Sequence, residues 1–241
     1  MTCNNNIIRT LVVQTDNRPN LEYVKLTKQA NELTCKLFQN SLNQIRYQFI
    51  QLETDQSGII HPATEKIFFT RNVISKYMNE VDIVVFLDSD AWINDINLLN
   101  ELIYKIYNAD TNGAFSRDPY FDYNTYINSG SFIIKVNQYI IEMYDGLVST
   151  VLSDKMHWYS WPYDQYYISN FVFRNKDKFI ILKPDVLNTP NGIVLRHNWD
   201  KNIQMYEDLN LILKKIKNIE SINDSFDWEF QIDNEPFPNK Q

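Results

Sequence analysis

The sequence lacks the features that mark secreted and membrane proteins. Its two cysteines, Cys3 and Cys35, are too few and too scattered for a disulfide framework or a zinc site, which fits a reducing compartment. No apolar run approaches the length of a membrane helix, and residues 1–6 lack the apolar core of a signal peptide. We therefore expect a cytoplasmic protein with no integral membrane segment. The abundance of Asn, Ile, Lys and Tyr is typical of an AT-rich genome such as that of a large DNA virus, in which case the compartment is the host cytoplasm.

A concentration of positive charge is also missing. The chain has a formal net charge of −7 and no basic block, which argues against nucleic acid as its main partner. No repeat or low-complexity linker divides its 241 residues, and the hydrophobic content of 44% is enough for the core of one large domain. We expect one domain over residues 1–219, followed by an acidic C-terminal tail over residues 220–241.

Strand and helix patterns alternate along most of the chain. Runs rich in β-branched and aromatic residues predict strands, and apolar residues that recur every three or four positions predict helices. This alternation favours βαβ units, and hence an α/β fold with a mixed, mostly parallel central sheet flanked by helices. The predicted strands are residues 7–13, 47–52, 82–87, 113–116, 127–135, 179–182 and 193–195, and the predicted helices are residues 21–42, 64–78, 97–107, 137–152, 203–219 and one that begins near residue 163.

The chain is organised around residues 82–93, where an apolar strand ends in Asp88, Ser89 and Asp90. The composition of this strand predicts burial on both faces. Two carboxylates this close repel each other, and burial worsens the repulsion unless a cation lies between them. Ligands of open α/β sheets bind at the carboxyl ends of the strands. The sequence therefore predicts Mg²⁺ or Mn²⁺ at Asp88 and Asp90, with a diphosphate on the metal.

Other kinds of site also use closely spaced aspartates. A calcium-binding EF-hand loop that starts at Asp88 would need Gly and Glu where this chain has Ile93 and Leu99, so that interpretation fails. A Mg²⁺-dependent phosphohydrolase of the haloacid dehalogenase type would use Asp88 as its nucleophile. It usually has Thr or Val in place of Trp92 and keeps the motif near the N-terminus, so it stays an alternative. Solvated or helix-capping aspartates are a third interpretation.

Four segments resemble, in the same order, the GT-A nucleotide-sugar glycosyltransferases, in particular the family of α-galactosyl-, α-mannosyl- and xyloglucan xylosyltransferases. Residues 84–91 are similar to the family's Leu-Asp-Ser-Asp-Ala pattern, and residues 127–134 to its Asn-x-Gly-x-Phe strand. The other two segments are the helix that bears Arg71 and residues 161–165, which His197 follows later. The resemblance implies a Rossmann-like GT-A fold and transfer of a sugar from a UDP- or GDP-linked donor to a glycan or other hydroxyl acceptor. A catalytically inactive sugar-nucleotide binding protein would show the same pattern.

The resemblance also implies a division of roles around the metal. Asp88, Asp90 and His197 would be its ligands, and the metal would bridge both phosphates of the donor. A half-buried structural histidine is an alternative for His197. Lys201 or Arg196 would stabilise the diphosphate, unless each is a solvated surface charge. The family's usual glycine soon after the late histidine is missing, which bears on this loop.

The implied donor-binding residues follow several strands. Residues 15–17 close the first strand, where the fold places base and ribose, although a helix-capping turn fits them equally. Gly130 permits close approach of the backbone to a ligand, and Asn128 can donate to and accept from sugar hydroxyls. Arg71 lies in a mostly apolar helix, so we expect it to face the Asp-Ser-Asp region or the donor, the alternative being a side chain that reaches solvent. The predicted donor-binding set is Thr15, Asp16, Asn17, Arg71, Asp88, Ser89, Asp90, Asn128, Ser129, Gly130 and Lys201.

An aromatic loop before residue 164 supplies the remaining candidates. Asp164 is the candidate carboxylate beside the anomeric carbon, acting as base on the acceptor hydroxyl in an inverting enzyme. In a retaining enzyme, Asp164 or Gln165 would stabilise the oxocarbenium-like centre. A helix N-cap is the alternative for Asp164. Trp158 and Trp161 are candidates for stacking on acceptor sugars, unless they are core or rim residues.

Overall fold

A six-stranded sheet forms the centre of the computed structural model, which describes residues 7–38, 40–52, 60–120 and 126–220. Its strands are β1 (Ile8–Asp16), β2 (Asn43–Gln51), β3 (Ile83–Leu87), β5 (Gly113–Arg117), β6 (Ile127–Lys135) and β7 (Ile180–Leu182). They lie in the order β2-β1-β3-β6-β5-β7. Strand β1 is parallel to β2 and β3, β5 is parallel to β7, and β6 is antiparallel to both of its neighbours. The predicted mixed, mostly parallel sheet is therefore confirmed.

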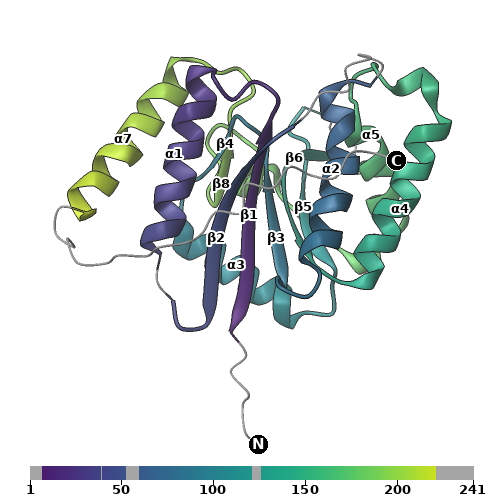
Figure 1. The fold of residues 1–241 in the computed structure, drawn as a ribbon, viewed down its shortest axis with the longest axis horizontal. Helices are drawn as coiled ribbons and strands as arrows, with labels where there is room; N and C mark the ends of the chain where they lie inside the picture. The colour runs from purple at the N-terminus through teal and green to yellow at the C-terminus, as the bar shows by residue number, and fades with distance from the viewer. Residues whose placement is uncertain (1–6, 39, 53–59, 121–125, 221–241) are drawn as a thin grey trace, which may run out of the picture.

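Helices cover both faces of this sheet (Figure 1). They are α1 (Glu22–Leu37), α2 (Pro62–Tyr77), α3 (Ile96–Asn108), α4 (Gln138–Ser153), α5 (Asp164–Arg174), α6 (Pro184–Leu187) and α7 (Ile203–Glu220), with 3₁₀ turns at Lys155–His157 and Lys176–Lys178. Val84 and Phe86 of β3 pack in one core with α2, α4 and α5, whereas Val85 and Leu87 pack in a second core with α3. The side chains of β3 point alternately to the two faces of the sheet, and helices cover both faces. All five residues of the strand are therefore buried. Burial of this strand on both faces is confirmed.

A second, two-stranded sheet lies next to the end of β3. It pairs β4 (Ala91–Ile93) with β8 (Leu195–His197) in antiparallel register, and Ala91 lies opposite His197. A third apolar cluster joins α1 and α7 around the fully buried Trp92. Neither β4 nor the short helix α6 was predicted, and the predicted strand at 193–195 lies two residues too early. Three-residue strands carry too little periodicity to be recognised in sequence.

Some helix ends differ from their predicted positions. Helix α1 ends at Leu37, five residues before its predicted end, and its C-cap Phe38 is already extended. Strand β2 begins at Asn43, four residues before the predicted start at residue 47. Helix α2 begins with Pro62, because the side chain of His61 accepts a hydrogen bond from the Ala63 N–H. Residues 221–241, most of the predicted tail, lie outside the described residues.

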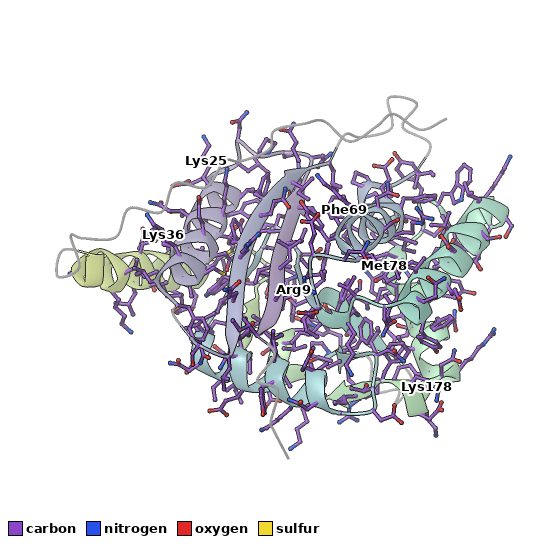
Figure 2. The ribbon with its side chains drawn as sticks, turned by 60° about the horizontal axis from the view of Figure 1, so that its bottom comes forward. Arg9, Lys25, Lys36, Phe69, Met78 and Lys178 are labelled. Carbon is purple, nitrogen blue, oxygen red and sulfur yellow. The ribbon has the colours of Figure 1, made fainter. Side chains whose placement is uncertain are left out.

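Charged side chains project outward from the helices, as Lys25 and Lys36 of α1 show (Figure 2). Within the described part of the chain, no helix combines the length and the apolar character needed to cross a membrane.

Candidate functional site

A tight turn after β3 carries both aspartates of the central motif. The Asp88 N–H donates to Gly130 O at 2.7 Å, and the Ala91 N–H donates back to Asp88 O at 3.0 Å. The chain then enters β4, which leaves Asp90 buried and Asp88 partly exposed. Parallel pairing of β1 with β3 places this turn beside residues 15 and 16 at the end of β1. The edge predicted for ligand binding is therefore formed by the segments expected there.

Buried polar side chains hold the backbone of this turn from below. Gln14 Nε2 lies 3.1 to 3.3 Å from three carbonyl oxygens of the turn. Thr27 Oγ1 donates to Ser89 O at 2.7 Å, and Asn31 Nδ2 donates to Ala91 O at 3.2 Å. Buried polar groups carry a cost unless they are paired, so this network specifies one position for the turn. Sequence reasoning missed these three residues, which lie on different elements and become neighbours only in the fold.

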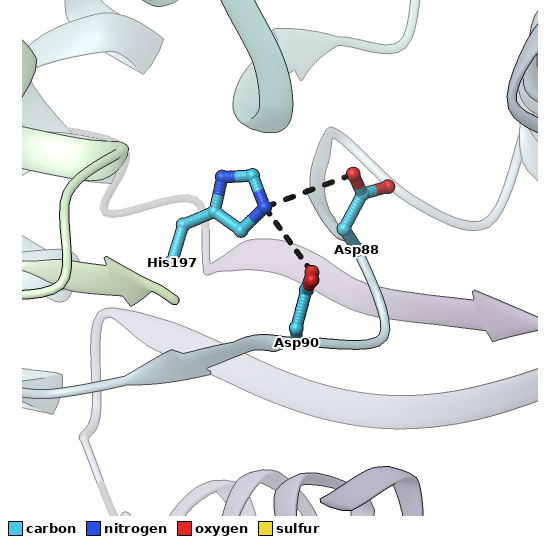
Figure 3. Close-up of side chains that lie close together, drawn as sticks. All are labelled: Asp88, Asp90 and His197. Atoms are coloured by element: carbon cyan, nitrogen blue, oxygen red, sulfur yellow. Dashed lines mark ion pairs between the residues drawn. The ribbon is translucent and has the colours of Figure 1, made fainter. Parts of the chain in front are cut away.

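Strand β8 brings His197 to the two aspartates (Figure 3). His197 Nε2 lies 3.1 Å from Asp90 Oδ1 and 4.0 Å from Asp88 Oδ2, and one ligand atom from each residue falls within 4.8 Å of the others. Gly130 packs against the imidazole, where any Cβ would collide with the ring. The group that Gly130 approaches closely in the structure is His197, whereas its predicted contact with a ligand stays a prediction.

The donor set of this cluster fits a divalent cation. Ligands bound at about 2.1 Å in octahedral geometry lie about 3 to 4 Å apart, close to the separations found here. Two carboxylates suit Mn²⁺ and Mg²⁺, and the imidazole nitrogen favours Mn²⁺ of the two. The structure thus brings together the three residues predicted as ligands, while their binding of a metal stays a prediction.

Two lysines neutralise the carboxylates. Lys66 of α2 places Nζ 2.8 Å from Asp88 Oδ1 and 3.2 Å from Asp164 Oδ2, and Lys201 Nζ lies 2.6 Å from Asp90 Oδ2. Burial opposes the charge of Lys66, but Asp164 and Asp88 outweigh it and raise the pKa of the ammonium. Lys201, which was predicted to contact the diphosphate, lines the cleft beside Asp90. Lys66 was not predicted.

Asp164 and Asp90 differ in how burial and charge balance. Burial raises the pKa of Asp164 to about 6, with Lys66 acting against the rise and Asp88 adding to it. For Asp90, burial also favours the protonated form, but His197 and Lys201 hold its pKa well below the usual range. Helix α5 begins at Asp164 itself, and its N-cap Tyr163 makes no side-chain capping bond. The helix-capping alternative for Asp164 is therefore wrong.

A cleft of about 290 Å³ opens beside these groups. Its wall includes most of the predicted donor-binding residues, namely Thr15, Asp16, Asn17, Asp88, Ser89, Asp90 and Lys201. Sequence reasoning missed Arg18, His61 and Lys66, which line it as well. The Thr15 hydroxyl is buried without a hydrogen-bond partner among the described residues, and Asp16 is paired with Arg18 at 3.2 Å. The capping-turn alternative for residues 15–17 is not seen, since α1 has no side-chain cap.

Arg71 is the clear error among the predicted donor-binding residues. Its Nε lies 2.8 Å from Asp145 Oδ1 in a partly exposed ion pair, and it does not line the cleft. Arg71 follows Lys66 by five residues, about 140° around the helix, so it faces α4 rather than the site. Arg196, offered beside Lys201 for the diphosphate, instead bonds Asp208 at 2.5 Å.

The remaining predicted residues lie on β6 and α5, away from the cleft wall. Asn128 Nδ2 and Gln165 Nε2 both donate to Asp118 Oδ2, at 3.1 and 3.0 Å. The Ser129 N–H donates to Gln165 Oε1 at 3.3 Å. Asp118 was missed, because a single aspartate after a short strand gives no sequence signal. These contacts connect the predicted residues of β6 to the start of α5 beside Asp164.

The two predicted acceptor tryptophans differ in their surroundings. Trp158 packs against the core that contains α2 and α4, and its Nε1 donates to Val151 O at 2.5 Å. Trp161 is 62% exposed.

After His197, the chain reaches Lys201 with a φ of 50°, so a non-glycine residue takes the left-handed conformation in the loop where the family resemblance predicts a glycine.

The solved structures that share this fold include two glycosyltransferases. A glycosyltransferase involved in the glycosylation of the major capsid of PBCV-1 matches with a TM-score of 0.59 and 17% identity, over 85% of this chain and 98% of that chain. The glycosyltransferase GlyE of Streptococcus pneumoniae TIGR4 matches with a TM-score of 0.58 and 15% identity, over 91% of this chain and 64% of that chain. This chain therefore spans somewhat less than two thirds of GlyE. The sequence matches no family model and has no significant match among curated proteins.

Proposed function

We propose that the chain is a metal-dependent glycosyltransferase that moves a sugar from a UDP- or GDP-linked donor to a glycan or other hydroxyl acceptor. One observation carries this proposal. Asp88, Asp90 and His197 converge beside a cleft at the carboxyl ends of β1 and β3, in a fold shared with two glycosyltransferases. A diphosphate needs cations, and this cleft combines a candidate cation site with two lysines.

Asp88, Asp90 and His197 would hold Mn²⁺ or Mg²⁺. The bound cation would supply Lewis acidity, offsetting the charge that develops on the departing nucleoside diphosphate. Lys201 would give up Asp90 for a phosphate oxygen, because its flexible ammonium can pair with either anion. Residues 15–17, which line the same cleft, would bind the base and ribose.

Asp164 and Gln165 would act at the anomeric carbon. Lys66 connects Asp164 to Asp88, so the carboxylate is held close to the candidate metal ligands. A pKa of about 6 leaves Asp164 mostly ionised at neutral pH yet able to accept a proton, which suits a base on the acceptor hydroxyl. The same charge would stabilise an oxocarbenium-like centre in a retaining enzyme. Asn128, Ser129 and Gly130 would form the floor of the sugar site.

The test is a thermal-shift panel of UDP- and GDP-sugars with and without Mn²⁺, since a ligand that binds the native state raises the melting temperature. One nucleotide sugar of the panel should raise the melting temperature of the wild-type chain, and it should do so only when Mn²⁺ is present. Asp90→Ala should lose this gain, because it removes a carboxylate whose negative charge would hold the cation. Asp145→Ala, which removes an exposed carboxylate of the Arg71 pair, is the matched control and should keep it.

Metal-dependent stabilisation that survives in Asp90→Ala would refute the metal assignment. Turnover distinguishes the alternatives. Release of nucleoside diphosphate that increases with an added acceptor supports the transferase, and hydrolysis of simple phosphate esters dependent on Asp88 supports the phosphohydrolase. Donor binding without turnover across many acceptors supports an inactive binding protein.

A further inference from the structure

Two aromatic side chains meet beside the site, outside the cleft wall. Tyr120 follows β5 and Trp199 follows β8, and the Trp199 Nε1 donates to the Tyr120 hydroxyl at 3.2 Å. Their ring centroids lie 5.4 Å apart at an interplanar angle of 67°. We call this pair the aromatic bridge, because it connects two segments that lie 79 residues apart in the sequence.

One end of the aromatic bridge rests on the candidate metal ligands. The ring of Trp199 lies edge-on to the ring of His197, with centroids 5.4 Å apart at 83°. Its carbonyl accepts a hydrogen bond from Lys201 Nζ at 3.0 Å, the same ammonium that bonds Asp90. Trp199 is thus placed by groups that would contact the metal and the diphosphate.

The other end rests on the polar groups near the predicted catalytic residues. The Tyr120 N–H donates to Asp118 Oδ1 at 2.8 Å, while Asp118 Oδ2 accepts from Asn128 and Gln165. Asp118 is buried, so its carboxylate fixes the backbone of Tyr120 to the floor proposed for the sugar site. The aromatic bridge therefore runs from the metal side of the site to its sugar side.

Tyr120 nevertheless remains 72% exposed. A large ring left in water carries an unfavourable apolar surface, whereas aromatic rings pack well against the C–H faces of sugars. Carboxylate and amide groups at its base could bind sugar hydroxyls. This combination of an apolar face with nearby polar groups is suited to a carbohydrate more than to a lipid or an extended peptide.

We propose that the aromatic bridge binds the acceptor, and that the acceptor is itself a carbohydrate. This inference rests on the proposed function. The cleft proposed for the nucleotide is lined by the end of β1 and the residues just after it, by the start of α2, by the Asp-Ser-Asp turn and by Lys201. Its wall includes neither Tyr120 nor Trp199, so the aromatic bridge lies outside the nucleotide cleft. Trp161, predicted for the same role, precedes Tyr163, whose ring stacks on the cleft residue His61 at 3.8 Å. The segment of Trp161 therefore lies on the side of the cleft that His61 lines.

The test measures sugar contact directly. Saturation-transfer NMR on the full chain, with UDP or GDP and with diamagnetic Mg²⁺ as the cation, would use the methyl α-glycosides of glucose, galactose and mannose, together with lactose. Tyr120→Ala and Trp199→Ala should weaken binding of the best sugar about tenfold, since one aromatic contact is worth up to about a factor of ten. Tyr120→Phe and Trp199→Phe each keep an aromatic ring at the position, without the hydrogen bond between the two side chains, and should bind within about threefold of wild type.

Tyr104→Ala removes another exposed aromatic, on α3, and should change nothing. The unliganded melting temperature of each variant confirms folding, and Trp199→Phe and Tyr120→Ala keep the test decisive if Trp199→Ala does not fold. Binding by no sugar of the set, unchanged binding in the Ala variants, or loss in Trp161→Ala alone would each overturn the proposal. If sugars bind the bridge but no nucleotide sugar shifts the melting temperature with Mn²⁺, the proposed function fails and the carbohydrate site stands.

Discussion

Two of the three cations of helix α2, Lys66 and Arg71, have sharply different surroundings. The side chain of Lys66 is 10% exposed and contacts two carboxylates of the site. The side chain of Arg71 is 37% exposed, and its partner Asp145 is 50% exposed. In sequence, both residues have apolar neighbours within three positions, so neither looks the more buried of the two. The comparison teaches that the direction of a helical side chain, rather than the character of its neighbours along the chain, decides what a cation does.

The energetic consequences of the two pairs differ in the same way. Water screens the Arg71–Asp145 pair, so its attraction is small. Lys66, Asp88 and Asp164 have been removed from much of the solvent, and each charge then depends on its neighbours. Removing one member of such a buried group leaves the others uncompensated. Three variants test this contrast.

Lys66→Met should have the largest effect. It leaves the carboxylate of Asp164 buried without its cation, so the free energy of unfolding should fall by about 3 kcal/mol at pH 7.5. Urea denaturation measures this loss. Asp164→Asn in the same chain removes the uncompensated charge and should restore a large part of the stability. A loss as small as that expected for a surface ion pair, with no rescue in the double variant, would contradict the buried interaction of Lys66 with Asp88 and Asp164.

Asp164→Asn alone should show a pH-dependent difference from wild type. The folded pKa of about 6 lies above the unfolded value of 3.8, so this carboxyl destabilises the fold as pH rises through that window. Relative to wild type, the variant should therefore gain about 2 kcal/mol between pH 4.5 and pH 7.5. Urea denaturation at both pH values gives the difference. A constant offset between the two proteins would mean that Asp164 titrates alike in both states.

Arg71→Met should have the smallest effect. Exposed ion pairs contribute little, so stability should change by about 0.5 kcal/mol or less, and the Mn²⁺-dependent response to the nucleotide sugar should persist. The same thermal and urea measurements apply. If this variant lost as much stability as Lys66→Met, or lost the Mn²⁺-dependent response, Lys66 and Arg71 would not differ as the structure indicates.

Much of the fold was predictable because its elements are regular and long. The run at residues 82–87 has a composition found in doubly buried strands, and β3 is such a strand. The helices 64–78 and 97–107 were found through their apolar spacing, which tertiary packing preserves as α2 and α3. The short strand β4 was missed and β8 was predicted two residues too early, because their pairing depends on residues 91 and 197 meeting across the fold.

The candidate site divides along the same line. Asp88 and Asp90 are neighbours in sequence, so their electrostatic problem is visible without a structure. His197 was placed with them through a family resemblance, and no local pattern around it would have sufficed. Lys66 and Asp118 carry no local signal at all, since a lysine in a helix and an aspartate after a strand are usually solvated.

The amino-acid sequence by itself determined that strands and helices alternate in an α/β fold, and that one apolar strand ends in two carboxylates that require a cation. Only the tertiary structure decided which cationic side chains contact these carboxylates, and which side chains line the cleft beside them. The physical reason is that charge repulsion within residues 88–90 acts over a single turn of backbone. The compensating groups at 66, 197 and 201 come within reach only when separate elements pack.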